Sequence, residues 1–287
     1  MNPTETERAP AAGKQGTPEP IATQGPRSLG AASTDRCFIC GTALHGAASA
    51  HEGRRSGVAY CEECFRAESE ERRDGIFAEA TRARWPTFRA GTDAELEAVA
   101  TLRRLPLPGI RLARARGLLR FATCYGAPCY VVTDDARQLA QARRLDGTTW
   151  KACVKALTLP GSVGGWPLGV EYADGAALLL LCEGGPDLLA GCAVVASMPN
   201  PCRVAALGMM GASMHIRPEA VALLRGIRCR IACHADAAGL AAGERWANQL
   251  RTIAQAPDLW QPDPPAKDLC DAIAAGVPSA SIVEGAL

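Results

Sequence analysis

Hydrophobic and polar positions divide the N-terminal part of the chain into three segments of different pattern. Residues 1–34 are rich in Pro, Gly, Ala, Thr and Glu and have no hydrophobic periodicity, which predicts a disordered tail. Residues 35–67 are rich in cysteine and glycine and contain few large apolar side chains. Residues 67–84 are charged and helix-like until Trp85-Pro86 breaks the pattern.

The middle of the chain changes from a helical period to a strand pattern. Apolar spacing predicts a helix over 93–105 with Asp93 as its N-cap, and a second short helix over 109–117 that ends at Gly117. From 118 to 158 the pattern favours strands, with a β-prone run at 128–133, a turn at 134–135 and a hairpin-type turn at 146–147. Residues 68–172 therefore predict a small, basic α+β module.

The C-terminal part alternates between short apolar runs and helical patterns. It predicts strands at 176–182, 203–207 and 227–233, helices at 187–197, 218–225, 238–254 and 267–275, and a proline-rich loop at 257–265. Alternation at this spacing indicates a parallel sheet with covering helices. The predicted fold class is thus α/β, with the parallel sheet in residues 173–287.

Composition and charge narrow the class of protein. The chain has 287 residues, of which 48% are hydrophobic and 21% charged, so a packed core is expected. Its net charge is only +1, but residues 101–145 carry nine arginines and two aspartates, which indicates either a phosphate-facing surface or a solvated face. The start of the chain has no apolar signal-peptide region, and no run of 18 apolar residues occurs. We expect a cytoplasmic protein without a membrane span, whose scattered cysteines are reduced.

Two Cys-x-x-Cys pairs lie in the cysteine-rich segment. They are Cys37–Cys40 and Cys61–Cys64, and 20 residues separate Cys40 from Cys61. Four thiolates at this spacing suit a closed tetrahedral Zn²⁺ site. A segment this short cannot bury enough apolar area by itself, so the metal would supply its folding energy. The sequence predicts a structural zinc ribbon at residues 35–67.

Two acidic loops follow predicted strands of the parallel sheet. Residues 183–187 read Glu-Gly-Gly-Pro-Asp, and residues 234–239 read His-Ala-Asp-Ala-Ala-Gly. The carboxyl ends of neighbouring parallel strands meet at the crevice where α/β sheets bind ligands. Clustered carboxylates there suit a cation such as Mg²⁺, which is usually held together with substrate phosphates. Either loop could instead be structural, with residues 183–187 a polar turn and Asp236 an N-cap for the next helix.

These motifs resemble the Toprim domain of topoisomerases and primases. Glu183 matches the family's Glu after one strand, and Asp236 matches the second Asp of its Asp-x-Asp pair. Asp187 matches a further acidic position of primase members. A Cys₄ zinc ribbon before a Toprim domain resembles bacterial, phage or plasmid primases, and the resemblance covers roughly residues 35–275. Four further stretches add to it: residues 141–147, residues 155–162, residues 206–212, which resemble the Gly-containing strand end of the Toprim core, and the Lys-Asp-Leu-Cys-Asp segment at 267–271.

The resemblance implies a Rossmann-like parallel sheet with helices on both faces, and a metal site for Mg²⁺ or Mn²⁺. Glu183, Asp187 and Asp236 would be its catalytic acids, and these three residues and His234 would be its metal ligands. His234 stands where the family has the first Asp of the pair. Because imidazole suits Mn²⁺ better than Mg²⁺, this departure predicts fewer Mg²⁺ ions, a preference for Mn²⁺ or weak activity.

The resemblance also implies partners and basic contact residues. Arg143, Arg144 and Lys155 would contact template or triphosphate, although strand alternation allows at most one of the two arginines to face a site. The partners would be single-stranded DNA, nucleoside triphosphates and a replicative helicase acting in trans.

The resemblance therefore implies a DNA primase-like enzyme of a phage, plasmid or mobile element that makes short RNA primers by metal-dependent nucleotidyl transfer. The alternatives are a Toprim nuclease and a non-catalytic DNA-binding replication accessory protein. Asp268 and Asp271 are expected to be helix-start charges rather than metal ligands.

Overall fold

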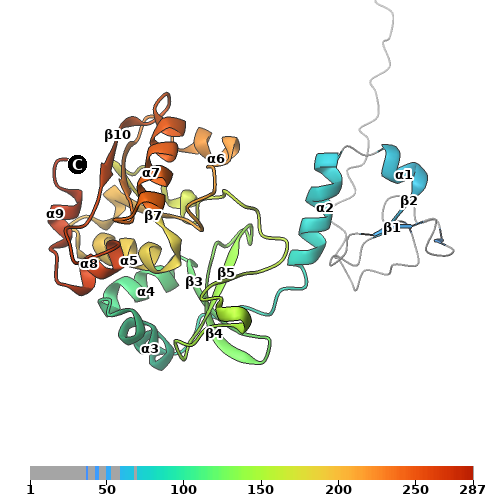
Figure 1. Ribbon diagram of the computed structural model, residues 1–287, viewed down its shortest axis with the longest axis horizontal. Coiled ribbons are helices and arrows are strands. Elements are labelled where there is room, and N and C mark those ends of the chain that lie inside the picture. The colour runs from blue at the N-terminus through green and yellow to red at the C-terminus, as the bar shows by residue number, and fades with distance from the viewer. Residues whose placement is uncertain (1–36, 38–42, 45–49, 53–58, 68–69, 287) are drawn as a thin grey trace, which may run out of the picture. The chain divides into compact units, whose positions relative to one another are not determined.

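The computed structural model describes residues 37, 43–44, 50–52, 59–67 and 70–286 (Figure 1). The predicted tail at 1–34 lies outside these residues. Within them, no helix is long and apolar enough to cross a membrane.

The cysteine-rich segment contains a short antiparallel pair of strands and a helix. Strand β1 (Ala50–Glu52) pairs with β2 (Ala59–Cys61), and α1 (Glu62–Ala67) follows. The backbone of Cys37 forms an isolated parallel bridge with Ala59. Helix α2 (Glu70–Arg82) corresponds to the helix predicted at 67–84, and its Phe77 packs edge-on against buried Tyr60. This aromatic contact is part of the small core of this segment.

An antiparallel sheet and two helices form the next part of the chain. Its strands lie in the order β3 (Leu119–Cys124), β4 (Ala127–Thr133), β5 (Ala140–Arg144) and β6 (Leu157–Thr158). Helices α3 (Asp93–Arg103) and α4 (Leu107–Ala115) precede it. The predicted N-cap at Asp93 is wrong by one residue, because Thr92 caps α3 in a capping box with Glu95.

A parallel sheet occupies the C-terminal part. Its order is β10 (Gln255–Trp260), β9 (Arg228–Ala232), β7 (Leu178–Glu183) and β8 (Val204–Met209). Strand β10 overlaps the first part of the predicted loop at 257–265, so that prediction is wrong for residues 257–260. It is an edge strand whose register shifts between Gln255 and Asp258, around Pro257, and edge or bulge positions tolerate proline.

Helices cover both faces of the parallel sheet (Figure 1). They are α5 (Gly184–Ser197), α6 (Pro218–Leu223), α7 (Ala237–Leu250), α8 (Leu269–Ala274) and α9 (Ser279–Val283). Alternate residues of β7 point to opposite faces, as strand geometry requires. Leu178 and Leu180 join a core with α5, α8 and α9, whereas Leu179 and Leu181 join a core with Trp246 of α7.

The first of these cores extends into the antiparallel part. It includes Leu96 of α3, Ile110 of α4 and Phe121 of β3 together with side chains of α5. Gly109 of α4 lies so close to α5 that a Cβ there would be 2.4 Å from the Cα of Ala193. The contact between α4 and α5 therefore fixes the antiparallel sheet beside the carboxyl ends of the parallel strands. Short 3₁₀ turns occur at Lys151–Cys153, Val170–Tyr172 and Pro201–Arg203.

Candidate active site

The two acidic loops follow adjacent strands, β7 and β9. The chain runs from β7 to β8 on one side and then crosses back to β9 on the other, so β7 and β9 flank a topological switch point. Open α/β sheets bind ligands outside the carboxyl ends of their strands at such a point. Glu183 ends β7 and is the N-cap of α5, while His234 follows β9. The fold thus brings the loops together, 47 residues apart from Asp187 to His234.

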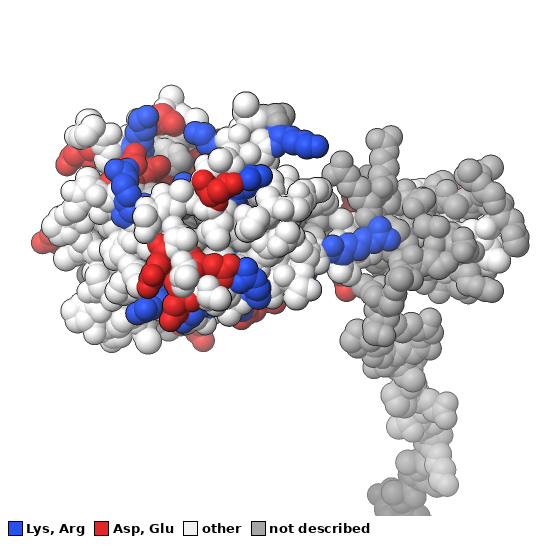
Figure 2. Space-filling view, turned by 90° about the horizontal axis from the view of Figure 1, so that it is seen from below, with Lys and Arg blue, Asp and Glu red and all other residues white. Residues whose placement is uncertain are grey.

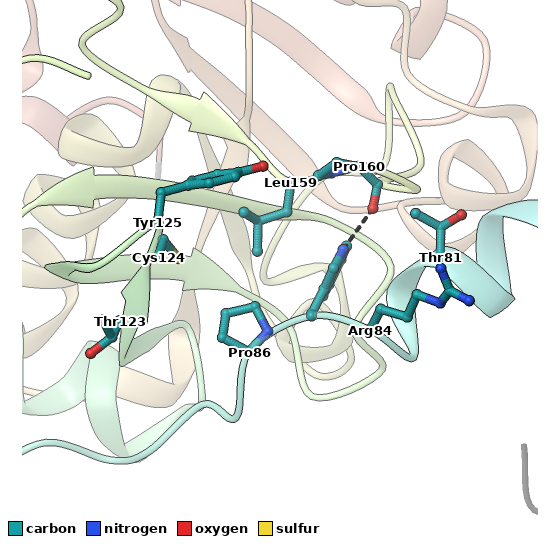
Figure 3. Close-up of a pocket in the computed structure, with 9 residues that line it drawn as sticks. Thr81, Arg84, Pro86, Thr123, Cys124, Tyr125, Leu159 and Pro160 are labelled. Atoms are coloured by element: carbon teal, nitrogen blue, oxygen red, sulfur yellow. Dashed lines mark hydrogen bonds between the residues drawn. The ribbon is translucent and has the colours of Figure 1, made fainter. Parts of the chain in front are cut away.

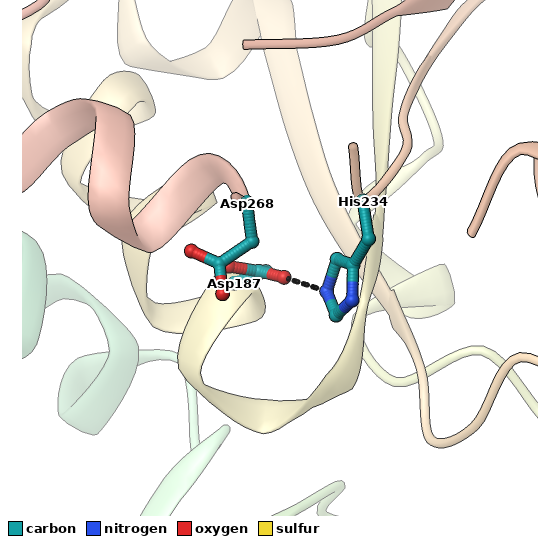
Figure 4. Close-up of side chains that lie close together, drawn as sticks. All are labelled: Asp187, His234 and Asp268. Carbon is teal, nitrogen blue, oxygen red and sulfur yellow. Dashed lines mark hydrogen bonds and ion pairs between the residues drawn. The ribbon is translucent and has the colours of Figure 1, made fainter. Parts of the chain in front are cut away.

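Three side chains from three elements form a cluster suited to a metal ion (Figure 4). Asp187 of α5, His234 after β9 and Asp268 before α8 each place one ligand atom within 4.8 Å of the others. His234 Nε2 lies 2.7 Å from Asp187 Oδ2, and the backbone N–H of Cys270 donates to Asp187 Oδ1 at 2.9 Å. Two carboxylates and an imidazole form a donor set that Mn²⁺ or Zn²⁺ accepts, and the carboxylates also suit Mg²⁺.

Burial sets the protonation of this cluster. Asp187 is only 2% exposed, and burial raises the pKa of its carboxyl to about 6, although the hydrogen bond to His234 opposes the shift. That same hydrogen bond raises the pKa of the His234 imidazole to about 9. At neutral pH without a metal, His234 therefore carries a proton and pairs with Asp187 as a cation. A metal ion would have to displace this proton to gain the imidazole as a ligand.

Glu183 lies beside the cluster rather than in it. Its Oε1 is 3.8 Å from His234 Nδ1. Burial raises the pKa of Glu183, His234 opposes this shift, and the charges of Asp236 and Asp268 add to it. Glu183 Oε2 is buried and has no hydrogen-bond partner among the described residues. A buried carboxylate oxygen without a partner is costly, so this atom is positioned for a ligand.

Asp236 and Asp268 both act as helix caps. Asp236 is exposed, and its Oδ1 accepts a hydrogen bond from the backbone N–H of Gly239 at 2.8 Å, as the capping alternative predicts. It is not part of the three-residue cluster. Asp268 Oδ1 accepts from the N–H of Asp271 at 2.7 Å, so it is a helix-start charge as expected. Asp268 is also a member of the cluster, which departs from the expectation that it is a helix-start charge rather than a metal ligand.

The acidic cluster shares a cleft of about 400 Å³ with basic side chains. Among the predicted basic residues, Arg143 and Lys155 line this cleft, and Arg144 does not. Arg144 points to the other face of β5, where it pairs with Asp146 and lies over the ring of Trp150. The alternation of side chains along the strand thus separates the two arginines. The cleft also has basic residues that were not predicted individually, Arg103 and Arg104.

Two polar side chains of β5 reach this cleft without protein partners. Gln141 Oε1 and Arg143 Nε are buried and accept or donate no hydrogen bond among the described residues, as is also true of Glu183 Oε2. Gln141 is 8% exposed. Unpaired buried donors and acceptors are uncommon in folded proteins, and three of them in one cleft indicate a place for a polar ligand. Gln141 begins the stretch 141–147 that resembles primases, but the sequence did not mark Gln141 itself as a site residue.

The remaining arginines of residues 101–145 do not form one basic surface. Arg114 pairs with Asp93 at 3.2 Å and Arg120 pairs with Asp135 at 2.8 Å. Figure 2 shows basic and acidic side chains lying side by side on the face that it presents. Three of the nine arginines, Arg103, Arg104 and Arg143, line the cleft together with the acids.

Two of the four predicted zinc ligands can be placed. Cys37 is 2% exposed and pairs through its backbone with Ala59, two residues before Cys61. Cys37 and Cys61, the first cysteines of the two Cys-x-x-Cys pairs, thus lie on neighbouring backbone segments. Cys40 and the side chain of Cys64 lie outside the described residues, so the zinc site stays a prediction.

Comparison with known proteins gives a match among solved structures but none by sequence. No protein-family model and no curated protein matches the sequence. Among solved structures, the chain is similar to the crystal structure of the primase fragment of bacteriophage T7 primase-helicase protein. The TM-score is 0.42 and the sequence identity 17%, with 85% of this chain and 95% of that chain covered.

Proposed function

We propose that the protein is a primase-type nucleotidyltransferase that makes short RNA primers on single-stranded DNA. The observation that carries this proposal is the shared cleft, in which an acidic cluster at the β7/β9 switch point faces basic side chains of β5 and α3. Nucleotidyl transfer needs chiefly positioning and neutralisation of phosphate charge, and this cleft offers groups for both. Residues 173–287 would form a Toprim domain, with an α+β module at 68–172 and a zinc ribbon at 35–67.

The acidic side of the cleft fits a divalent cation. Asp187, His234 and Asp268 would hold Mg²⁺ or Mn²⁺, with Glu183 Oε2 unpaired beside them and Asp236 adding charge. A bound ion would neutralise charge on the attacking and leaving oxygens of the reaction. Asp187 is held in place from both sides, by His234 and by the N–H of Cys270, so its orientation is fixed before any ligand arrives.

The basic side of the cleft would bind the triphosphate or template. Arg143 suits bidentate contact with phosphate, and Lys155 adds a point charge. Burial lowers the pKa of Arg143, so an incoming anion would find a poorly hydrated cation. Arg103 Nε donates to the hydroxyl of Tyr130 at 2.7 Å, which orients this side chain at the rim.

The remaining parts of the proposal concern the N-terminal segment and the partners. Cys37, Cys40, Cys61 and Cys64 would bind Zn²⁺, and the ribbon that they close would help to select template. A replicative helicase would act in trans, within the replication of a phage, plasmid or mobile element.

A second candidate is a non-catalytic DNA-binding accessory protein. The hydrogen bond between His234 and Asp187 favours it, because a protonated imidazole already supplies a positive charge inside the acidic cluster. Such a protein would bind DNA in a salt-dependent manner without metal-dependent turnover.

The test is synthesis of labelled primers from ribonucleotides on single-stranded DNA, with Mg²⁺ and Mn²⁺ in separate reactions. Wild type and Glu183→Gln are compared, and a reaction without nucleotides tests for cleavage by a nuclease. The proposal expects metal-dependent products from the wild type and a loss of at least about 100-fold in the variant, in line with removal of a catalytic acid. DNA binding without products from either protein would support the accessory protein instead.

A further inference from the structure

The tip of the β3–β4 hairpin carries an aromatic side chain in an unfavourable position. Tyr125 is 79% exposed, more than any other large hydrophobic residue that the structure describes. Tyr125 and Gly126 form the two-residue turn, and both have positive φ, 49° and 79°. Such turns prefer Asn-Gly or Asp-Gly, because a bulky residue at positive φ is strained. Tyr125 is thus unfavourable for stability in two ways, because its backbone is strained and its aromatic ring is exposed to solvent.

A pocket of about 330 Å³ lies beside Tyr125 (Figure 3). Its described lining includes the apolar side chains of Trp85, Pro86 and Leu159, with Arg84 and no acidic residue. The pocket wall is preformed, because Trp85 is 7% exposed and its Nε1 donates to the carbonyl of Pro160 at 2.6 Å. The volume lies in the range of small-molecule sites.

Three arginines lie at or beside the pocket. Arg84 is exposed at its rim. Arg137 lies over the ring of Trp85, with its guanidinium carbon 5.6 Å from the ring centroid. Arg82 donates to the carbonyl of Gly161 at 2.9 Å, next to the pocket residue Pro160. An aromatic platform with arginines around it is complementary to a nucleic-acid strand whose bases are unstacked.

We propose that this pocket binds one nucleotide of single-stranded DNA, with its base stacked on Tyr125 and its phosphate near Arg84. The choice of single-stranded DNA as the ligand rests on the proposed function, and the pocket would be a second site of contact with the template. The pocket and the catalytic cleft lie on opposite faces of the antiparallel sheet. Cys124 and Leu159 pack in one core with Ala140 and Ala142 of β5, whereas the alternate β5 residues Gln141 and Arg143 face the cleft. The bound nucleotide is therefore outside the reacting centre and holds the strand.

The experiment uses the full chain and a dye-labelled oligothymidylate, with affinity measured by fluorescence anisotropy. In Tyr125→Asn the ring is removed and the turn is relaxed, so loss of folding cannot explain weaker binding. Tyr125→Phe retains the ring, and Leu223→Asn removes another exposed apolar side chain far along the chain. The dissociation constant should rise about tenfold in Tyr125→Asn and stay near the wild-type value in the other two. Arg84→Ala should flatten the salt dependence of binding.

If Tyr125→Asn and the wild type bind the oligothymidylate with equal affinity, the proposal is wrong, because the Tyr125 ring would then make no contact with the DNA. Photo-crosslinking of an oligonucleotide that contains 5-iododeoxyuridine, mapped to Tyr125 or Trp85, would support it independently. Primer synthesis by the wild type is measured in parallel. If DNA binding depends on Tyr125 but no primer is made, the result would support the nucleotide pocket and contradict the proposed function. If primers are made but DNA binding does not depend on Tyr125, the result would support the proposed function and contradict the nucleotide pocket.

Discussion

Nε2 of His234 lies 2.7 Å from Oδ2 of Asp187, within the cluster that these two residues form with Asp268. The imidazole comes from the loop after β9, and the carboxylate comes from the first turn of α5. This pair joins the two loops that the sequence marks as acidic. It also makes the metal-free site dependent on pH.

The first prediction concerns stability against pH in buffer without Mg²⁺ or Mn²⁺. The pKa of His234 is raised from its ordinary 6.5 to about 9 in the folded protein, so protonated His234 stabilises the fold. This stabilisation is fully present below pH 6.5 and is lost as the pH rises through 9. The free energy of unfolding, measured with urea and tryptophan fluorescence, should therefore fall over this range. The fall should be smaller in Asp187→Asn and unchanged in His215→Asn, and an equal fall in all three proteins would contradict the assignment.

The second prediction compares two adjacent arginines of β5. Arg143 lines the cleft, whereas Arg144 pairs with Asp146 on the opposite face. Arg143→Ala should raise the KM for ribonucleotides about tenfold or more, since a buried charged contact to phosphate is lost. Arg144→Ala should change it by less than about twofold, because exposed ion pairs contribute little. Steady-state primer synthesis measures both, and similar effects would show that the cleft assignment is wrong.

The third prediction concerns the unpaired amide of Gln141. Replacement by Leu removes a buried acceptor that has no partner in the protein. The free energy of unfolding should stay the same or rise by up to about 1 kcal/mol, because no internal hydrogen bond is broken. Nucleotide affinity should fall, since the ligand loses a polar contact. Chemical denaturation and nucleotide binding, measured on the same preparation, test whether stability and function move in opposite directions. A destabilised variant with normal affinity would mean that Gln141 is purely structural.

The fourth prediction tests the contact between α4 and α5. Gly109→Ala places a methyl group against the backbone of Ala193 and should lower the free energy of unfolding by about 1–3 kcal/mol. Gly75→Ala is the matched control, because it is exposed on α2 with no atom within 4 Å of the new Cβ. It should raise the stability of its helix by about 0.5–1 kcal/mol. Thermal unfolding followed by circular dichroism compares the two, and a neutral Gly109→Ala would mean that the helices separate easily.

Local patterns predicted the elements better than the contacts between them. The apolar run before Glu183 gives β7 directly, and Asp236 was recognised as a possible helix cap. Strand β10 was missed because Pro257 reads as a strand breaker, and only the edge position in the sheet makes it acceptable. Strand alternation predicted that at most one of Arg143 and Arg144 faces a site, but the sequence does not show which of the two it is. That choice depends on the packing of Tyr130, the cross-strand neighbour of Arg143, into the core.

In the candidate site, too, local sequence predicted some residues, whereas others depend on contacts between elements. Glu183, Asp187 and His234 could be predicted together because two neighbouring strands deliver them to one crevice. Asp268 could not be predicted as a site residue, because it caps α8 and reaches the site only through the packing of that helix on α5. Its capping role is evident from sequence, whereas its position beside Asp187 follows only from the tertiary fold.

The most direct test of the account is the metal dependence of primer synthesis in Asp268→Asn. Asparagine is as good an N-cap as aspartate, so α8 should be retained while one negative charge of the cluster is lost. The incorporation of labelled ribonucleotides on single-stranded DNA is measured over a titration of Mn²⁺ and of Mg²⁺, with wild type beside it. The account predicts that the wild type makes primers and that the variant needs at least about tenfold more metal to reach half its maximal rate. Identical metal curves for the two proteins, or no synthesis by the wild type with either metal, would contradict it.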